Sequence, residues 1–297
     1  MQLISRSTAS TGSRCSKSHA CSLAPGPTPQ RHSLRVVARG RTQTVLIVKH
    51  GEDGPRRVPD ELVVEEPLEI RLDDHLVTTT MRTPGHDFEL AVGFLHSEGL
   101  LAGAPVKTVR YCGTGSAVET EFNVVSVDTG GIAPVPTARL TPTTASCGIC
   151  GSESIADLCK RLAPLDTAAV EVDVLAKVPS RVLAEQTVFS TTGGVHAAAA
   201  FDASGAPLLV REDIGRHNAV DKVVGRLLLD GTLPAEGLGL FVSGRASFEI
   251  VQKAWAAGFA TVVAVSAPSS LAVETAKAAS IRLVGFARED RLNIYAE

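Results

Sequence analysis

Two cysteines separated by two residues carry the clearest chemical signal in this sequence. Cys147 and Cys150 stand in the run Ser-Cys-Gly-Ile-Cys-Gly. A thiol pair at this spacing can form a disulfide, supply half of a metal site or carry a persulfide. A structural zinc site usually needs a second pair at matching spacing, and Cys112 and Cys159 are not spaced as a pair. Redox or sulfur chemistry at the first pair is therefore favoured, and no metal ligand is assigned.

The segment around this pair, residues 137–151, is rich in proline, threonine, serine and glycine. Its composition predicts a mobile loop. The glycines beside the thiols remove steric cover, which suits a thiol that a second macromolecule must reach. We expect the isolated Cys112 and Cys159 to be buried small hydrophobic residues. Cys15 and Cys21 fall in an unusual N-terminal segment and are not assigned to the site.

Paired glycines mark a second candidate site. Gly193 and Gly194 precede His196 in the run Thr-Thr-Gly-Gly-Val-His. The backbone N–H groups of adjacent glycines can converge on an anion. A plain turn before a strand would have the same sequence, so both interpretations stay open.

Two later segments place arginine where a predicted strand meets a predicted helix. Arg216 and His217 stand at one junction, and Ser243 and Arg245 stand at the next. Helix N-termini at the carboxyl ends of strands are where α/β sheets bind anionic ligands. An arginine can hold phosphate with its planar fork, and a histidine can transfer protons. Two such junctions predict one anion-binding pocket, although polar residues at a helix entry also serve as caps.

One pattern points to a different chemistry. His96 and Glu98, taken with Cys147 and Cys150, resemble the H-x-E and C-x-x-C runs of zinc nucleoside deaminases. In those enzymes the first run opens a helix and a proline precedes the first cysteine, whereas here His96 ends a predicted helix and a serine precedes Cys147. A zinc-dependent deaminase-like hydrolase is therefore kept as the alternative function.

Composition excludes several classes of protein. The 297 residues carry a net charge of −3 and only nine Phe, two Tyr and one Trp. These values argue against a nucleic-acid partner, whether bound through its backbone or by base stacking. No apolar run approaches the roughly 18 residues of a membrane span. Residues 1–25 lack the apolar core of a signal peptide, so a reducing cytoplasm is the expected location.

The N-terminal segment, residues 1–44, has no acidic residue and is rich in arginine and serine. This composition is typical of an organellar transit peptide, which would place the protein in an organelle. The alternative is a disordered tail or a start codon placed too far upstream.

Residues 45–140 predict a strand-rich domain of α+β type with one helix. The helix is expected over residues 88–95 and closed by Gly99. Pro67 favours an edge position for the extended segment 62–72. Further strands are expected at residues 45–48, 75–81, 106–111 and 122–127.

Residues 141–297 predict an α/β domain that begins with the mobile cysteine loop, residues 141–152. A short helix is expected over residues 155–161, and the rest has the order β-β-α-β-α-β-α-β-β. Strands alternating with helices of about ten residues imply a largely parallel sheet with helices on both faces.

Taken together, these runs resemble the FdhD family of sulfur carriers, which active formate dehydrogenase requires. The resemblance extends in order from about residue 45 to the C-terminus and includes Thr-Pro-Gly-His-Asp and Ser-Glu-Gly upstream. The runs that carry it are Ser-Cys-Gly-Ile-Cys-Gly, Thr-Gly-Gly-Val-His, Glu-Asp-Ile-Gly-Arg-His-Asn-Ala-Val-Asp-Lys, Ser-Gly-Arg-Ala-Ser-Phe-Glu, Val-Ser-Ala-Pro-Ser-Ser-Leu-Ala-Val and Val-Gly-Phe-Ala-Arg.

The resemblance implies a sulfurtransferase that works through a cysteine persulfide. A cysteine desulfurase of the IscS type would load sulfur onto Cys147, with Cys150 as the auxiliary thiol. The sulfur would pass to the bis-molybdopterin guanine dinucleotide cofactor before its insertion into apo-formate dehydrogenase. GDP-like nucleotides would fit the same site, and a homodimer is expected.

The resemblance also implies a fold and a cofactor-binding stretch. The fold would be a cytidine-deaminase-like three-layer core with a smaller strand-rich N-terminal domain. Arginines and glycine-rich helix entries suit the pyrophosphates of the cofactor. The stretch comprises Phe286, Ala287, Arg288, Glu289, Asp290 and Arg291.

Overall fold

The computed structural model describes residues 40–112, 116–118, 120–136, 155–166, 170–289 and 291–297. The predicted cysteine loop, residues 141–152, lies outside the described residues, as does most of the N-terminal segment. The first strand, β1 (Thr42–Gly51), begins inside the segment assigned to the leader.

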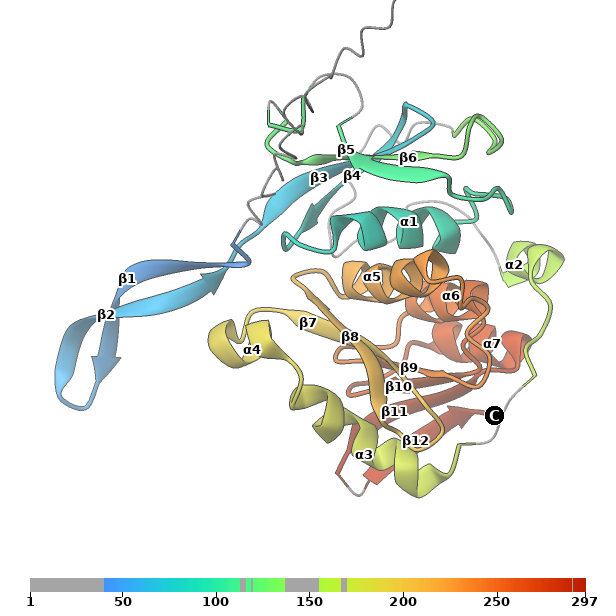
Figure 1. Ribbon diagram of the computed structural model, residues 1–297. Helices are drawn as coiled ribbons and strands as arrows, with labels where there is room; N and C mark the ends of the chain where they lie inside the picture. Colours follow the sequence, from blue (N-terminus) through green and yellow to red (C-terminus); the bar gives the residue numbers. More distant parts are fainter. Residues whose placement is uncertain (1–39, 113–115, 119, 137–154, 167–169, 290) are drawn as a thin grey trace, which may run out of the picture. The chain divides into compact units, whose positions relative to one another are not determined.

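A two-stranded antiparallel hairpin opens the described chain. In it, β1 pairs with β2 (Gly54–Val63) along its full length (Figure 1). The sequence predicted a short strand at residues 45–48 and an extended segment from residue 62, and it missed most of β2. Pro55 and Pro59 lie in this strand. In a two-stranded sheet each strand has a free edge, so prolines are tolerated there.

A four-stranded sheet follows, with strand order β4-β3-β6-β5. Its buried side chains, among them Leu68 and Ile70, pack against Leu90 and Leu95 of the first helix, α1. The bounds are β3 (Glu66–Leu72), β4 (His75–Arg82), α1 (Asp87–Ser97), β5 (Thr108–Tyr111) and β6 (Val124–Asp128).

The expectation that Pro67 places its strand at an edge was wrong. Strand β3 lies between β4 and β6. It pairs with β6 only from Glu69 onward, so Pro67 stands outside that ladder and interrupts none of its hydrogen bonds. A proline near the start of an internal strand is tolerated for this reason.

The last six strands form a mixed sheet with the strand order β12-β11-β10-β9-β7-β8. The predicted order β-β-α-β-α-β-α-β-β is confirmed for the elements from β7 to β12. The bounds are β7 (His196–Phe201), β8 (Pro207–Asp213), α5 (Arg216–Leu229), β9 (Gly239–Val242), α6 (Phe248–Ala257), β10 (Thr261–Ala264), α7 (Ser270–Ala279), β11 (Arg282–Arg288) and β12 (Arg291–Ala296).

The sheet is less parallel than the sequence predicted. Only β9, β10 and β11 pair in parallel, while β7–β8, β7–β9 and β11–β12 pair antiparallel. Short turns join β7 to β8 and β11 to β12, and a tight turn joins strands antiparallel whereas a helical crossover joins them in parallel. The expectation of a largely parallel sheet therefore holds only for the central strands.

Helices cover both faces of this sheet (Figure 1). Leu240 and Val242 of β9 face one way, into a core with α5, α6 and α7. Phe241 between them faces the other way, into a core with Leu175 and Val178 of α3 (Val172–Leu183). This alternation makes three layers, helix–sheet–helix.

Three helices stand between the two sheets in the chain. The short α2 (Ile155–Arg161) has the predicted bounds. The sequence did not predict α3, which has Pro179 in its interior, or α4 (Thr187–Thr192). After α2 the chain is held on α6, because the indole N–H of Trp255 donates to the carbonyl of Ala163 at 2.8 Å.

The two sheets are joined through buried charged groups. Helix α1 packs against α5. The Nζ of Lys222 on α5 lies 2.7 Å from Asp213, and both side chains are fully buried. The same Nζ donates to the carbonyl of Thr83, whose N–H donates to Asp213. No helix among the described residues is long and apolar enough to cross a membrane.

Candidate functional site

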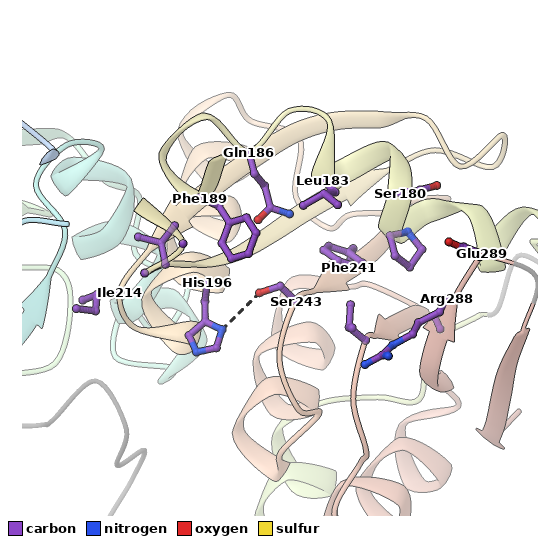
Figure 2. Close-up of a pocket in the computed structure, with 16 residues that line it drawn as sticks. Ser180, Leu183, Gln186, Phe189, His196, Ile214, Phe241, Ser243, Arg288 and Glu289 are labelled. Atoms are coloured by element: carbon purple, nitrogen blue, oxygen red, sulfur yellow. Dashed lines mark hydrogen bonds between the residues drawn. The ribbon is translucent and has the colours of Figure 1, made fainter. Parts of the chain in front are cut away.

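A cavity of about 590 Å³ opens at one edge of the six-stranded sheet (Figure 2). Ser243 and Val265 line it directly after β9 and β10, and Ile214 lines it directly after β8. His196 reaches the same edge because β7 runs antiparallel to β9. Residues of α3 and α4 form the opposite wall. The cavity therefore lies where α/β sheets commonly bind ligands.

The structure brings seven of the predicted binding residues to this cavity, although they are far apart in the sequence. Its lining includes Gly193, Gly194, His196, Ser243, Ala287, Arg288 and Glu289.

His196 and Ser243 form the polar floor of the cavity. The Nδ1 of His196 lies 3.4 Å from the Oγ of Ser243 (Figure 2). The N–H of Ala197 donates to the same Oγ at 2.9 Å, which fixes the hydroxyl. Burial lowers the pKa of His196 and the charge of Arg216 lowers it further, against the opposing effect of Asp213. The ring is therefore mainly uncharged at neutral pH and can accept a proton from a ligand.

Arg216 borders this floor but does not line the cavity. A Cβ placed on Gly244 would be 3.7 Å from the Cδ of Arg216 and 3.5 Å from the His196 ring, so both side chains border Gly244. The Nε of Arg216 is buried and has no hydrogen-bond partner among the described residues. A buried donor without an acceptor is costly.

The paired glycines do not form an anion nest. Gly193 ends α4 in the left-handed region, and its N–H donates to the carbonyl of Phe189 at 2.7 Å. The N–H of Gly194 donates to the hydroxyl of Thr192 at 3.2 Å. Because both donors already have partners, the turn interpretation is the correct one. A Cβ on Gly193 would meet open space, whereas one on Gly194 would lie 3.1 Å from the side chain of Val63.

His217 and Arg245 lie outside the cavity lining. His217 is buried, and its Nε2 lies 3.4 Å from Ser247 and 3.8 Å from Glu249. It therefore joins the entries of α5 and α6. Arg245 is exposed to solvent.

The predicted cofactor stretch forms the turn between β11 and β12. Arg288 pairs with Arg291 across this turn. Ala287 is buried, and Arg288 and Glu289 reach the cavity mouth. Phe286 is 44% exposed and, like Arg291, does not line the cavity. Asp290 lies outside the described residues.

The cysteines divide differently from the prediction. Cys147 and Cys150 lie outside the described residues. Cys159 on α2 is exposed and Cys112 is half-buried. The expectation that both are buried was wrong, because Cys159 faces outward on a short helix whose inner face is occupied by Leu158.

The sequence missed most of the apolar wall of the cavity. Leu183 ends α3, Phe189 lies in α4 with Gln186 directly before it, and Phe241 comes from the centre of β9. The only sequence signal for α3 was the spacing of Leu175, Val178 and Val182, which places them on one helical face.

A carboxylate outside the cavity lining holds this wall in place. Glu212 accepts hydrogen bonds from the backbone N–H groups of Val188 and Phe189 at 3.0 and 2.8 Å. These are free donors of the first turn of α4, which a carboxylate stabilises. Glu212 therefore positions the cavity wall that includes Gln186 and Phe189.

His96 and Glu98 make packing contacts. The Nε2 of His96 lies 3.0 Å from the carbonyl of Ala256 on α6. Glu98 lies 3.6 Å from the Nζ of Lys253. Within the part of the chain that the structure describes, no three His, Cys, Asp or Glu residues are arranged to hold a metal ion.

Comparisons with known proteins agree with the motifs. Residues 63–297 match the model of the FdhD/NarQ family. The chain is 46% identical to the sulfur carrier protein FdhD of Nocardia farcinica over 89% of this chain and 94% of that one. It is 50% identical to the sulfur carrier protein FdhD of Streptomyces avermitilis over 85% of this chain and 92% of that one.

The fold has a counterpart among solved structures. A protein from Desulfotalea psychrophila, described as a formate dehydrogenase accessory protein, superposes with a TM-score of 0.68 at 23% identity. The match covers 87% of this chain and 98% of that one, so the two share the mixed α/β fold. Because the family model matches most of the chain and the relatives are 46% and 50% identical to it, this chain belongs to the FdhD/NarQ family.

Proposed function

We propose that this protein is a sulfur carrier that serves formate dehydrogenase. Relatives named as sulfur carrier proteins, 46% and 50% identical over most of the chain, support the proposal. The single structural observation that carries it is the cavity at the carboxyl end of the six-stranded sheet, which brings seven of the predicted binding residues together around the polar pair His196 and Ser243. A carrier of cofactor sulfur needs such a binding site as well as a reactive thiol.

The transfer would run through Cys147. Its thiolate attacks the outer sulfur of a persulfide on a cysteine desulfurase of the IscS type. A new S–S bond forms at Cys147, the S–S bond of the donor breaks, and the donor cysteine leaves as a thiolate. Cys150 would serve as the auxiliary thiol of the pair. Attack of the Cys150 thiolate on the inner sulfur of the Cys147 persulfide would break its S–S bond, release the outer sulfur to the cofactor at the sulfide level and leave a Cys147–Cys150 disulfide, which a cellular dithiol would reduce.

The proposed recipient is the bis-molybdopterin guanine dinucleotide cofactor, before its insertion into apo-formate dehydrogenase. Arg216, Ser243 and the uncharged His196 would bind its phosphates at the sheet edge. Arg288 at the cavity mouth would add a second positive charge. We also propose that the three-layer core is of the cytidine deaminase type, which the element order of this half supports.

Persulfide loading tests the proposal directly. Incubation with a cysteine desulfurase and cysteine should add about 32 Da, one sulfur atom, to the intact protein. Cys147→Ala should abolish this adduct. Cys159→Ala is the matched control, because it removes an exposed thiol outside the motif and should leave loading unchanged.

Complementation gives the second measurement. In a strain that lacks its own carrier, the unaltered chain should restore formate dehydrogenase activity, and Cys147→Ala should not. Restoration by both Cys147→Ala and Cys150→Ala would overturn the mechanism.

A further inference from the structure

Three charged side chains are buried together where α1, α5 and α6 meet. Lys253 of α6 donates to both carboxylate oxygens of Asp221 on α5, at 2.8 and 2.9 Å. Glu98, which directly follows α1, lies 3.6 Å from the same Nζ. The three side chains are only 2–5% exposed. None of them lines the cavity described above.

This cluster lies at the joint between the two sheets. Helix α1 packs on the four-stranded sheet, whereas α5 and α6 pack on the six-stranded one (Figure 1). The backbone carbonyl of Asp221 lies so close to Gly93 of α1 that a Cβ at Gly93 would overlap it. A change in the charge of the Asp221 side chain is therefore a change inside this joint.

The charges of the cluster do not balance. One lysine serves two carboxylates, so the three groups carry one excess negative charge when all are ionised. The ring of Phe94, whose centre lies 5.4 Å from the Nζ of Lys253, favours the charged form of the lysine. Excess charge in a buried place is costly, and two carboxylates that share a site tend to bind a proton instead.

The other charged groups on the elements around α5 are engaged elsewhere. They form three separate pairs, which are Asp213 with Lys222, Glu89 with Arg211 and Glu249 with His217. His96 of α1 is directed to the carbonyl of Ala256. Among the described residues, the charges that act on Asp221 come from Lys253 and Glu98.

We propose that this cluster is a proton-linked switch in the joint between the two sheets. As the pH falls below neutral, Asp221 and Glu98 together take up one proton from the solvent, and the joint becomes more stable. The inference does not depend on the proposed function, because it involves neither the cavity nor the cysteine pair.

The direction of the effect follows from the burial of the carboxylate. Burial raises the pKa of Asp221 from 3.8 to about 6, with Lys253 opposing the rise and Glu98 adding to it. Between these two values the folded protein holds a proton that the unfolded chain has released. The contribution to stability is therefore complete below pH 3.8 and is lost as the pH rises through about 6.

Urea unfolding at a series of pH values from about 5.5 to about 7.5 tests this directly. Asp221→Asn keeps the shape of the side chain and removes the titrating group. Relative to this variant, the unaltered protein should gain stability as the pH falls, with up to about one more proton bound on folding. Asp230→Asn is the matched control, because Asp230 directly follows the same helix and forms an exposed pair with Arg226. It should follow the unaltered protein.

Two histidines act in the opposite direction over this range. Burial lowers the pKa of His96 and of His196, so each binds its proton more weakly in the folded protein. Both are present in every variant, and the differences between variants therefore isolate the cluster.

A second variant and a second measurement cover the case in which Asp221→Asn does not fold. Glu98→Gln leaves Lys253 with one carboxylate, so proton uptake should fall as it does in Asp221→Asn. Infrared spectroscopy observes the folded state itself. A band of a protonated carboxyl group should appear as the pH falls in the unaltered protein and in Asp230→Asn, and it should be lost in both cluster variants.

The outcomes decide the proposal. If Asp221→Asn and Asp230→Asn both keep the pH dependence of the unaltered protein, the cluster binds no proton and the inference is wrong. An unaltered protein without the infrared band would overturn it equally, even if no variant folds. Loss of the dependence in Asp221→Asn but not in Glu98→Gln would contradict a site shared by the two carboxylates. None of these results bears on sulfur transfer.

Discussion

Gly93 of α1 and Gly225 of α5 meet backbone to backbone. A Cβ placed on Gly93 would lie 2.7 Å from the N of Gly225, and one placed on Gly225 would lie 2.8 Å from the N of Gly93. No real Cβ comes so close to a backbone atom. The close approach of these two helices, and with it the joint between the two sheets, therefore requires glycine at both positions.

Gly225→Ala should destabilise the fold by about 3 kcal/mol or more, because the methyl group must force two packed backbones apart. Urea unfolding followed by circular dichroism measures the change. Gly51→Ala is the matched control, since nothing lies within 4 Å of a Cβ there. Equal stability of the two variants would show that the helices are not in contact.

Breaking the buried pair of Lys222 and Asp213 should also be costly. Lys222→Met removes the cation and leaves the Asp213 carboxylate buried without its partner, which costs about 3–5 kcal/mol. Arg56→Met breaks an exposed pair with Asp53 and should change the unfolding midpoint hardly at all. A small effect of Lys222→Met in the same urea titration would argue against full burial of the pair.

Acid should weaken the contact between Glu89 and Arg211. Burial alone would raise the pKa of Glu89, but hydrogen bonds from Arg211 and His86 and their charges hold it at about 2. Since this pKa lies below the ordinary value of 4.5, the contribution is complete above pH 4.5 and is lost as the pH falls toward 2.

Glu89→Gln should therefore lower stability at pH 7 by about 1–3 kcal/mol, allowing for screening by solvent. Its unfolding free energy should fall less steeply between pH 4.5 and pH 3 than that of the unaltered protein. Urea titrations across this range give both slopes. Parallel slopes would mean that Glu89 does not titrate with folding.

The two predicted phosphate-binding arginines should differ in effect. Arg216→Ala should weaken GDP binding by about 1.5–3 kcal/mol, the value of a charge-assisted hydrogen bond. Arg245→Ala should have a much smaller effect, because Arg245 is exposed, whereas Arg216 borders Gly244 together with the His196 ring that lines the cavity. Calorimetric titrations compare the two. A larger loss for Arg245→Ala would place the anion site on the other side of the α6 entry.

Sequence patterns predicted the second half of the fold well. The predicted order of strands and helices agrees with that observed from β7 to β12, since apolar runs and periodic faces dominate there. The elements that the sequence did not predict include α3 and most of β2, both of which contain proline, a residue that breaks the local pattern even where tertiary packing tolerates it.

The site was predictable only on its polar side. Arg216 and Ser243 stand at helix entries, which a sequence reveals. Gln186 and Phe189 depend on α4, whose start is fixed by Glu212 from a distant strand. No local pattern encodes that contact. Conversely, His217 has polar chemistry suited to a ligand but joins two helices instead.

The hydrogen bond between Trp255 and Ala163 has a practical consequence. Trp255 is the single tryptophan of the chain and is 2% exposed. Its indole binds the segment that follows α2, close in sequence to the cysteine pair. Intrinsic fluorescence therefore comes from one known place. A red shift of its emission during sulfur loading would report, without any attached dye, that this segment has left α6.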